Sequence, residues 1–157
     1  MEDTIYAVNT LLVELFNDIL SIERDTLKKS KFSDLSVTEI HIIEAIGMEQ
    51  KNMTELSSQL GVTVGTLTTS INRLVKKEYV SRTRGKTDRR YVEIMLTEKG
   101  KLAYSVHEAF HEKMVRTMTD KLSKGDNEIL IESLKRLNQF FVVNDEREDK
   151  AKKNKKV

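Results

Sequence analysis

Two helical patterns separated by a glycine constrain this chain more than any other feature. Asn52 precedes Glu55 at the spacing of a helix capping box, and two leucines four residues apart then share one face. Gly61 follows where the chain must turn, because glycine adopts positive φ at little cost. Thr63 is the candidate N-cap of a second helix. The stretch therefore predicts two helices joined by a tight turn.

The second helix has two unlike faces. Leu67, Ile71 and Leu74 recur at helical spacing on the side expected to be buried. The opposite side is polar and begins almost without charge, which suits hydrogen bonds and methyl contacts with base edges in the major groove of DNA. We expect DNA contacts from Thr63, Gly65, Thr66, Thr68, Thr69, Asn72 and Arg73. From this helix alone, an ordinary exposed face stays an open alternative.

A basic hairpin follows the second helix. Residues 80–84 alternate, residues 85–88 have turn composition, and residues 91–96 predict the return strand. Five of the ten residues from Ser81 to Arg90 are Lys or Arg, and Asp88 is the one acid among them. We expect phosphate contacts from Arg82, Arg84 and Lys86, and entry of Arg89 or Arg90 into the minor groove. Asp88 is expected to brace this wing by pairing with an arginine or capping the turn.

The charge of the chain is concentrated in the same segment. Residues 1–60 hold 5 Lys or Arg and 11 Asp or Glu, residues 61–90 hold 8 and 2, and residues 91–144 hold 8 of each. The whole chain has a net charge of only +2. Such a local excess is the electrostatic footprint of phosphate binding. The alternative is a solvated surface loop whose charges are screened by salt.

Length and composition exclude several classes of protein. The 157 residues predict one domain over 1–144 and a charged, disordered tail over 145–157. Cysteine is absent, so the chain forms no disulfides. We find no signal peptide and no apolar run of about 18 residues, and expect a cytoplasmic protein without membrane contact. No nucleophile with a base, phosphate-binding glycine loop or catalytic carboxylate pair is evident, so we expect no enzyme.

The first and last helical segments have wide apolar faces. Apolar residues recur three and four apart from Ile5 to Ile22, and again from Leu130 to Phe141. Both segments are distant in sequence from the predicted DNA-reading region at 35–97. Packing of segments 1–34 and 98–144 about a two-fold axis would bury these faces and present two recognition helices to DNA. We therefore expect an obligate homodimer that binds an inverted repeat.

The order of elements resembles that of the MarR family of dimeric winged-helix regulators. The resemblance rests on two motifs, Thr87-Asp88-Arg89-Arg90 at the wing and Leu-Thr-Glu-Lys-Gly at residues 96–100. It extends over residues 5–142. The family usually has glycine where this chain has Glu78. The resemblance implies a mainly helical fold of about six helices with a small β-hairpin.

A narrower resemblance is to the MarR-type repressors of fatty-acid biosynthesis in streptococci and their relatives. It rests on residues 62–72, 16–20, 87–90 and 107–111. It implies repression of type II fatty-acid synthesis genes, with long-chain acyl-acyl carrier protein as a corepressor that strengthens DNA binding. The acyl chain of that carrier is the only effector we expect, and no cofactor is expected.

An acyl chain needs a narrow apolar slot between helices. The residues that we expect to line it are Leu15, Phe16, Ile19, Ile40, Ile43, Val106, Phe110 and Met114. Each could instead be an ordinary core residue. Because a carrier protein is acidic, we expect it to dock near the basic wing and the end of the recognition helix.

Two rival regulators stay open. One is a MarR-type regulator that a small aromatic ligand releases from DNA. The other is zinc-responsive, because His107 and His111 lie four apart on one predicted helix and His41 is the third histidine. Two ligands are too few for Zn²⁺ unless Glu108 or Glu112 joins them. We therefore interpret the histidines as surface or boundary residues and predict no metal site.

Overall fold

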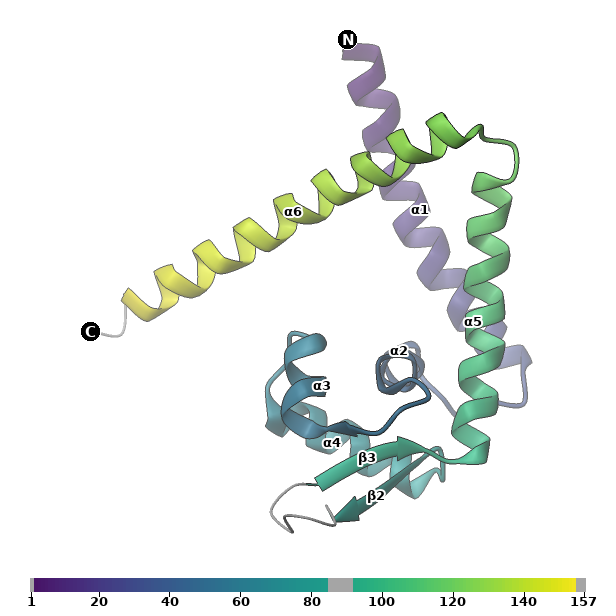
Figure 1. Ribbon diagram of the computed structural model, residues 1–157, viewed down its shortest axis with the longest axis vertical. Helices are drawn as coiled ribbons and strands as arrows, with labels where there is room; N and C mark the ends of the chain where they lie inside the picture. Colours follow the sequence, from purple (N-terminus) through teal and green to yellow (C-terminus); the bar gives the residue numbers. More distant parts are fainter. Residues whose placement is uncertain (1, 85–91, 155–157) are drawn as a thin grey trace. The chain divides into compact units, whose positions relative to one another are not determined.

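The computed structural model describes the backbone of residues 2–84 and 92–154 and the side chains of residues 2–83 and 92–140. The predictions for Lys86, Asp88, Arg89 and Arg90 lie outside these described residues. Along the chain the elements are α1 (Glu2–Lys29), α2 (Val37–Ile46), β1 (Lys51–Asn52), α3 (Met53–Gln59), α4 (Val64–Lys76), β2 (Val80–Arg84), β3 (Val92–Leu96), α5 (Glu98–Thr119) and α6 (Lys124–Asn154) (Figure 1). The mainly helical winged fold is confirmed.

Local side-chain hydrogen bonds fix where the helices begin. Ser36 and Glu39 form a complete capping box at the start of α2. The Asn52 side chain accepts from Glu55 N–H at 2.8 Å, and the Thr63 hydroxyl accepts from Thr66 N–H at 3.2 Å. Each bond satisfies a backbone donor that the helix itself leaves without a partner. The starts that the sequence predicts for α3 and α4 are therefore confirmed.

The three strands form an antiparallel sheet in the order β1-β3-β2. Val80 lies opposite Leu96 and Arg84 opposite Val92, so β2 and β3 form the predicted hairpin. Strand β1 was not predicted, because a strand of two residues shows no alternation of polar and apolar side chains. It places Lys51 opposite Ile94.

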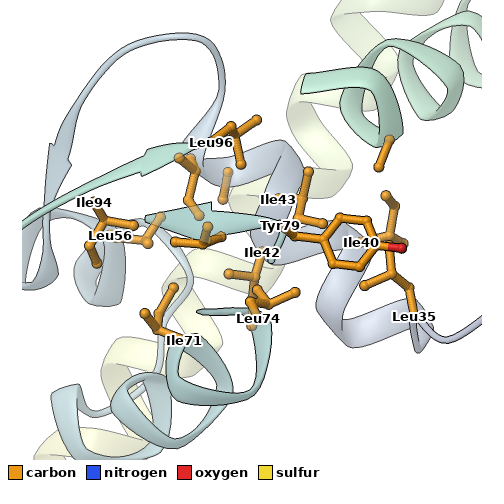
Figure 2. Close-up of a cluster of buried hydrophobic side chains, with 14 of the residues drawn as sticks. Leu35, Ile40, Ile42, Ile43, Leu56, Ile71, Leu74, Tyr79, Ile94 and Leu96 are labelled. Atoms are coloured by element: carbon orange, nitrogen blue, oxygen red, sulfur yellow. The ribbon is translucent and has the colours of Figure 1, made fainter. Parts of the chain in front are cut away.

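The core of the winged region joins α2, α3 and α4 to the sheet. Leu56, Ile71 and Leu74 meet Ile94 and Ile43 there, all at 0% exposure (Figure 2). Leu67 is buried beside them, as the helical spacing of its face predicts. The apolar face of α4 is thereby fixed against the sheet, and its polar face is left to solvent.

The chain divides into two compact units, residues 1–110 and 111–157, where we expected one domain over residues 1–144. In the second unit α6 is a single helix whose apolar side chains are largely exposed, among them Ile129, Ile131, Leu134 and Phe140. Among the described residues of this unit, none belongs to the buried hydrophobic core.

Helix α6 also continues through residues 145–154, where we expected a disordered tail. Those residues are mostly Glu, Lys, Arg and Ala, which are good helix formers. The composition that suggested disorder is therefore also compatible with an extension of the helix.

Helix α1 departs from another expectation. It contains an 18-residue stretch of mean hydropathy 1.4, long and apolar enough to cross a membrane by length and composition alone. Our expectation that no such run exists was wrong, because two acidic side chains interrupt the run without making it polar. The exposed residues of α1 include Ile5, Val8, Leu15 and Phe16. A helix that packs against a partner chain has the same composition.

Gly100, in the first turn of α5, packs directly against the backbone of Tyr79. A Cβ atom at position 100 would lie 2.0 Å from the Tyr79 carbonyl oxygen. Gly100→Ala must therefore displace the start of α5, and we expect the free energy of unfolding to fall by about 1–3 kcal/mol or more. Urea unfolding measures this change.

The control is Gly65→Ala in α4. A Cβ atom at position 65 meets only the Thr63 hydroxyl oxygen, at 3.9 Å. Its free energy of unfolding should not fall. Equal stability of Gly100→Ala and the unmodified chain would contradict the close packing described here.

Candidate nucleic-acid interface

The polar face of α4 presents most of the residues predicted to contact DNA. Thr63, Gly65, Thr66, Thr69, Asn72 and Arg73 are exposed, and Thr68 is half-buried. Ile71 and Leu74, on the opposite face, are fully buried and hold the helix on the core. The polar face is thus rigidly supported, as a reader of base edges must be.

The threonine hydroxyls of α4 are already engaged within the helix. Thr68 Oγ1 donates to the Val64 carbonyl at 2.7 Å, and Thr69 Oγ1 donates to the Gly65 carbonyl at 3.4 Å. A hydroxyl has one proton to donate, so in this state these oxygens offer lone pairs and the side chains offer methyl groups. Such a face suits base-edge donors and the methyl group of thymine.

The hairpin of β2 and β3 lies beside α4 (Figure 1). Arg82 is exposed on β2, and Arg84 is the last residue of that strand. Arg82 and Arg73, which lies on α4, are two of the residues expected to contact DNA. Both side chains are described, and both are exposed. The register of β2 against β3 confirms the predicted hairpin.

A network of charged and polar groups anchors the end of α4. Lys77 Nζ lies 2.8 and 2.9 Å from the two carboxylate oxygens of Glu39 and also donates to the Asp34 carbonyl. The Tyr79 hydroxyl donates to the Asp34 carboxylate at 2.7 Å. Lys99 Nζ lies 4.1 Å from the centre of the Tyr79 ring and donates to the Lys77 carbonyl at 3.0 Å. No local sequence pattern reveals this network, because its members are up to 65 residues apart.

Burial and hydrogen bonding shift two pKa values in this network. Burial, followed by the hydrogen bond to Asp34, raises the pKa of the Tyr79 phenol. For Glu39, burial acts to raise the pKa, but hydrogen bonds from Lys77 and Ser36 outweigh it, and the pKa lies below its ordinary 4.5. Glu39 is therefore ionised in the folded chain near neutral pH and holds Lys77 in place.

The turn between α4 and β2 uses a left-handed residue. Glu78 has a φ of 65°, a conformation that favours glycine. The resemblance noted that the family usually has glycine here. Glu78 thus adopts the turn geometry that glycine would adopt, and its Cβ atom lowers the stability of the fold by about 1–2 kcal/mol. The Thr97 hydroxyl donates to the Glu78 carbonyl at 2.6 Å and helps to hold the turn.

A small cavity lies in the first unit, among α1, α2 and α5. Its volume is about 30 Å³, and it is lined by Glu23, Thr26, Leu27, Ser30, Phe32, Ile40, Ala103, Val106, His107 and Phe110. Three of the residues expected to line an acyl slot, Ile40, Val106 and Phe110, do line this cavity.

Five of the expected slot residues do not line the cavity. Leu15 and Phe16 are exposed on α1, and Ile19 is half-buried. Ile43 is buried in the core of the winged region, because its side of α2 faces the sheet. Met114 belongs to the second unit. Helical periodicity identified apolar faces but could not tell which faces meet one another.

Comparison with known proteins decides the family. A model of the SarA/Rot transcriptional regulators matches residues 26–106. The HTH-type transcriptional regulator YpoP of Bacillus subtilis is 33% identical over 109 residues, which cover 69% of this chain and 72% of YpoP. The chain belongs to the MarR/SarA family of winged helix-turn-helix regulators.

Two further relatives refine the comparison. SarZ of Staphylococcus saprophyticus is 44% identical over 69 residues, and this match spans 43% of the chain and only 47% of SarZ. The crystal structure of Streptococcus pneumoniae FabT in complex with DNA is similar at 38% identity, with a TM-score of 0.79, over 85% of this chain and 94% of FabT. The chain is a DNA-binding transcriptional regulator of this family and not an enzyme.

Gly65 offers a test of how closely α4 approaches DNA. An alanine at this position stabilises a helix by about 1 kcal/mol, and its methyl group has space in the free chain. If the backbone at this position meets a phosphate, the same methyl group will weaken DNA binding. We expect Gly65→Ala to raise the unfolding temperature and lower the affinity measured by fluorescence anisotropy. Gly125→Ala in α6 is the control and should leave affinity unchanged, and equal affinities for all three proteins would exclude close approach at Gly65.

The anchor of α4 predicts a dependence of stability on pH. The pKa of Glu39 is lower in the folded chain than in the unfolded chain, so the pair with Lys77 stabilises the fold above about pH 4.5 and is lost as the pH falls through the folded pKa. We expect Lys77→Met to cost about 1–3 kcal/mol at pH 7 and less at pH 3.5. Urea unfolding at both pH values measures this, with Lys76→Met, at an exposed neighbouring position, as the control. A cost independent of pH would assign the effect of Lys77 to packing.

Proposed function

We propose that this chain is a homodimeric repressor of type II fatty-acid synthesis genes, with long-chain acyl-acyl carrier protein as its corepressor. The observation that supports this most strongly is the likeness to FabT, which extends over 85% of the chain at 38% identity. The target genes and the effector come from the narrower sequence resemblance. The local charge of residues 61–90 and the polar face of α4 support an operator as the binding partner.

The exposed apolar side chains support a dimer. Leu11, Leu15, Phe16 and Leu20 on α1 are each between 46% and 57% exposed, and Ile129 and Phe140 on α6 are more than 60% exposed. Large exposed apolar faces usually mark an interface in a chain that works in water. A second copy of the chain would cover them and pair two α4 helices on an inverted repeat. As a transcription regulator, the protein would act on DNA in the cytoplasm.

The cavity supports an apolar effector but must open to admit one. A volume of about 30 Å³ has room for about two water molecules, whereas a long acyl chain is far larger. Entry of the acyl chain would therefore separate the helices that surround the cavity. One of them, α2, contributes Ile43 to the core that supports α4. A shift of α2 would change the position of the recognition helix, which gives an effector a physical route to DNA affinity.

A small aromatic ligand that releases the protein from DNA is the second candidate. The observation that favours it is the size of the cavity, whose wall already includes the aromatic rings of Phe32 and Phe110. Such a ligand would need less opening than an acyl chain. The two candidates differ in the sign of the effect, since one strengthens DNA binding and the other weakens it.

The test is a gel-shift titration on an inverted-repeat promoter of fatty-acid synthesis genes. We expect acyl carrier protein with progressively longer acyl chains to increase affinity, and unacylated carrier protein to have no effect. Val106→Phe is the matched variant, because Val106 is a partly exposed residue of the cavity wall and a larger side chain there would fill the space. It should bind DNA normally and lose the response to acyl chains. A flat response of the unmodified protein to chain length would refute the corepressor.

A further inference from the structure

An apolar side chain is exposed on α4, the helix expected to meet DNA. Val64, the first residue of α4, is branched and apolar, yet it is 45% exposed and lies outside the buried face of the helix. It is not among the residues that the sequence led us to expect at the DNA. Thr68 and Asn72 follow at intervals of four residues, so the three side chains form one row along the helix. Asn72 is exposed and Thr68 is half-buried, so the row is open to a bound duplex.

The Thr68 hydroxyl is engaged within the helix. Its Oγ1 donates to the Val64 carbonyl at 2.7 Å, an ordinary distance for a full O–H···O hydrogen bond. A threonine hydroxyl has one proton, so the Thr68 side chain keeps no donor for a base. The bond also restricts rotation about the Cα–Cβ bond and thereby fixes the direction of the methyl group. Thr68 therefore adds a methyl group to the row that the apolar Val64 side chain begins.

Charged residues are absent from the part of α4 that precedes Arg73. The twelve residues 61–72 contain no Asp, Glu, Lys or Arg, in a chain of which 33% of the residues are charged. Arginine and lysine are the usual partners of guanine, through its O6 and N7 acceptors. Asn72 instead carries an amide group, which forms paired hydrogen bonds with N6 and N7 of adenine. The composition of the row thus favours A·T pairs over G·C pairs.

We propose that Val64 and Thr68 contact the C5-methyl groups of thymines in the major groove and that Asn72 bonds to an adenine, so that α4 selects A·T pairs in each half-site. Members of the row are about 6 Å apart along the helix axis, whereas base pairs are stacked about 3.4 Å apart, so each member meets a different base pair. The proposal rests on operator binding by α4, which is part of the proposed function. It requires neither the fatty-acid synthesis genes nor the acyl effector.

Thymine and cytosine differ at the edge of the major groove in a way that this row detects. Thymine presents a methyl group and an O4 acceptor, whereas cytosine presents an N4 amino donor. Contact between the Val64 side chain and the thymine methyl group removes apolar surface from water, which is favourable. The same contact with cytosine would bury an amino group without a hydrogen-bond partner, which is unfavourable. A methyl contact therefore discriminates between the two pyrimidines without a hydrogen bond.

The test begins with the selection of a binding site from random duplex DNA by the full-length protein, a step that assumes no target gene. Each thymine of one half-site is then replaced by deoxyuridine, which removes the C5-methyl group and keeps the base pair. Fluorescence anisotropy measures the affinity for each duplex. We expect two of the replacements, one for each of Val64 and Thr68, to weaken binding about fourfold, the fold-change that corresponds to exposing one apolar carbon to water.

Three variants assign the effect to methyl groups of the protein. Thr68→Ser keeps the hydroxyl and loses the methyl group, so it should bind the thymine site about fourfold more weakly and lose the preference over deoxyuridine at one position. Thr68→Val keeps the methyl group and loses the hydroxyl, so it should retain that preference and bind within about twofold of the unmodified chain. Val64→Ala should lose the preference for thymine at the second position.

Thr117→Ser in α5 is the matched control, because the Thr117 hydroxyl donates in the same way to the carbonyl four residues earlier, at 2.8 Å. It should bind both kinds of duplex as the unmodified chain does. Equal affinity of the unmodified chain for all thymine and deoxyuridine duplexes would overturn the proposal, and so would an equal loss of affinity in Thr68→Val and Thr68→Ser. Dependence on thymine methyl groups at a site unrelated to fatty-acid synthesis genes would confirm the proposal and refute those target genes.

Discussion

The position of the polar face of α4 depends on the ion pair between Glu39 and Lys77. Glu39 caps the start of α2 through Ser36, and the same carboxylate receives Lys77 from the end of α4. The Glu39 side chain therefore fixes both the start of α2 and the end of α4. Tyr79 and Asp34 complete the arrangement with a hydrogen bond that also fixes the start of the wing. Because this network and the buried apolar face of α4 hold the helix in place, its opposite face is free to carry exposed threonines.

Much of the fold could be predicted from the sequence because its determinants are local. Ser36, Thr63 and Ser123 cap helices within three residues of themselves, and the alternation after Val80 identified the hairpin. The face of α4 that meets DNA in the proposal follows from its 3.6-residue period. These features need no knowledge of distant contacts.

The cavity and the ion pairs beside it could not be predicted in the same way. Ile40 and Ile43 both belong to the buried core, yet only Ile40 also lines the cavity. Which of two neighbouring apolar residues faces which helix depends on the packing of α1 and α5. The contacts of His41 with Glu23 and of Glu44 with His107 depend on the packing of those same helices.

The central position of β3 has a consequence for how the wing acts. Strand β3 pairs with β2 on one side and with β1 on the other, and Asn52 at the end of β1 is also the N-cap of α3. A displacement of the hairpin on binding a duplex would be transmitted through β3 and β1 to the first turn of α3. The hairpin and the helix that precedes α4 are thus mechanically linked. Bending of the DNA would therefore shift the support of the recognition helix as well as the wing.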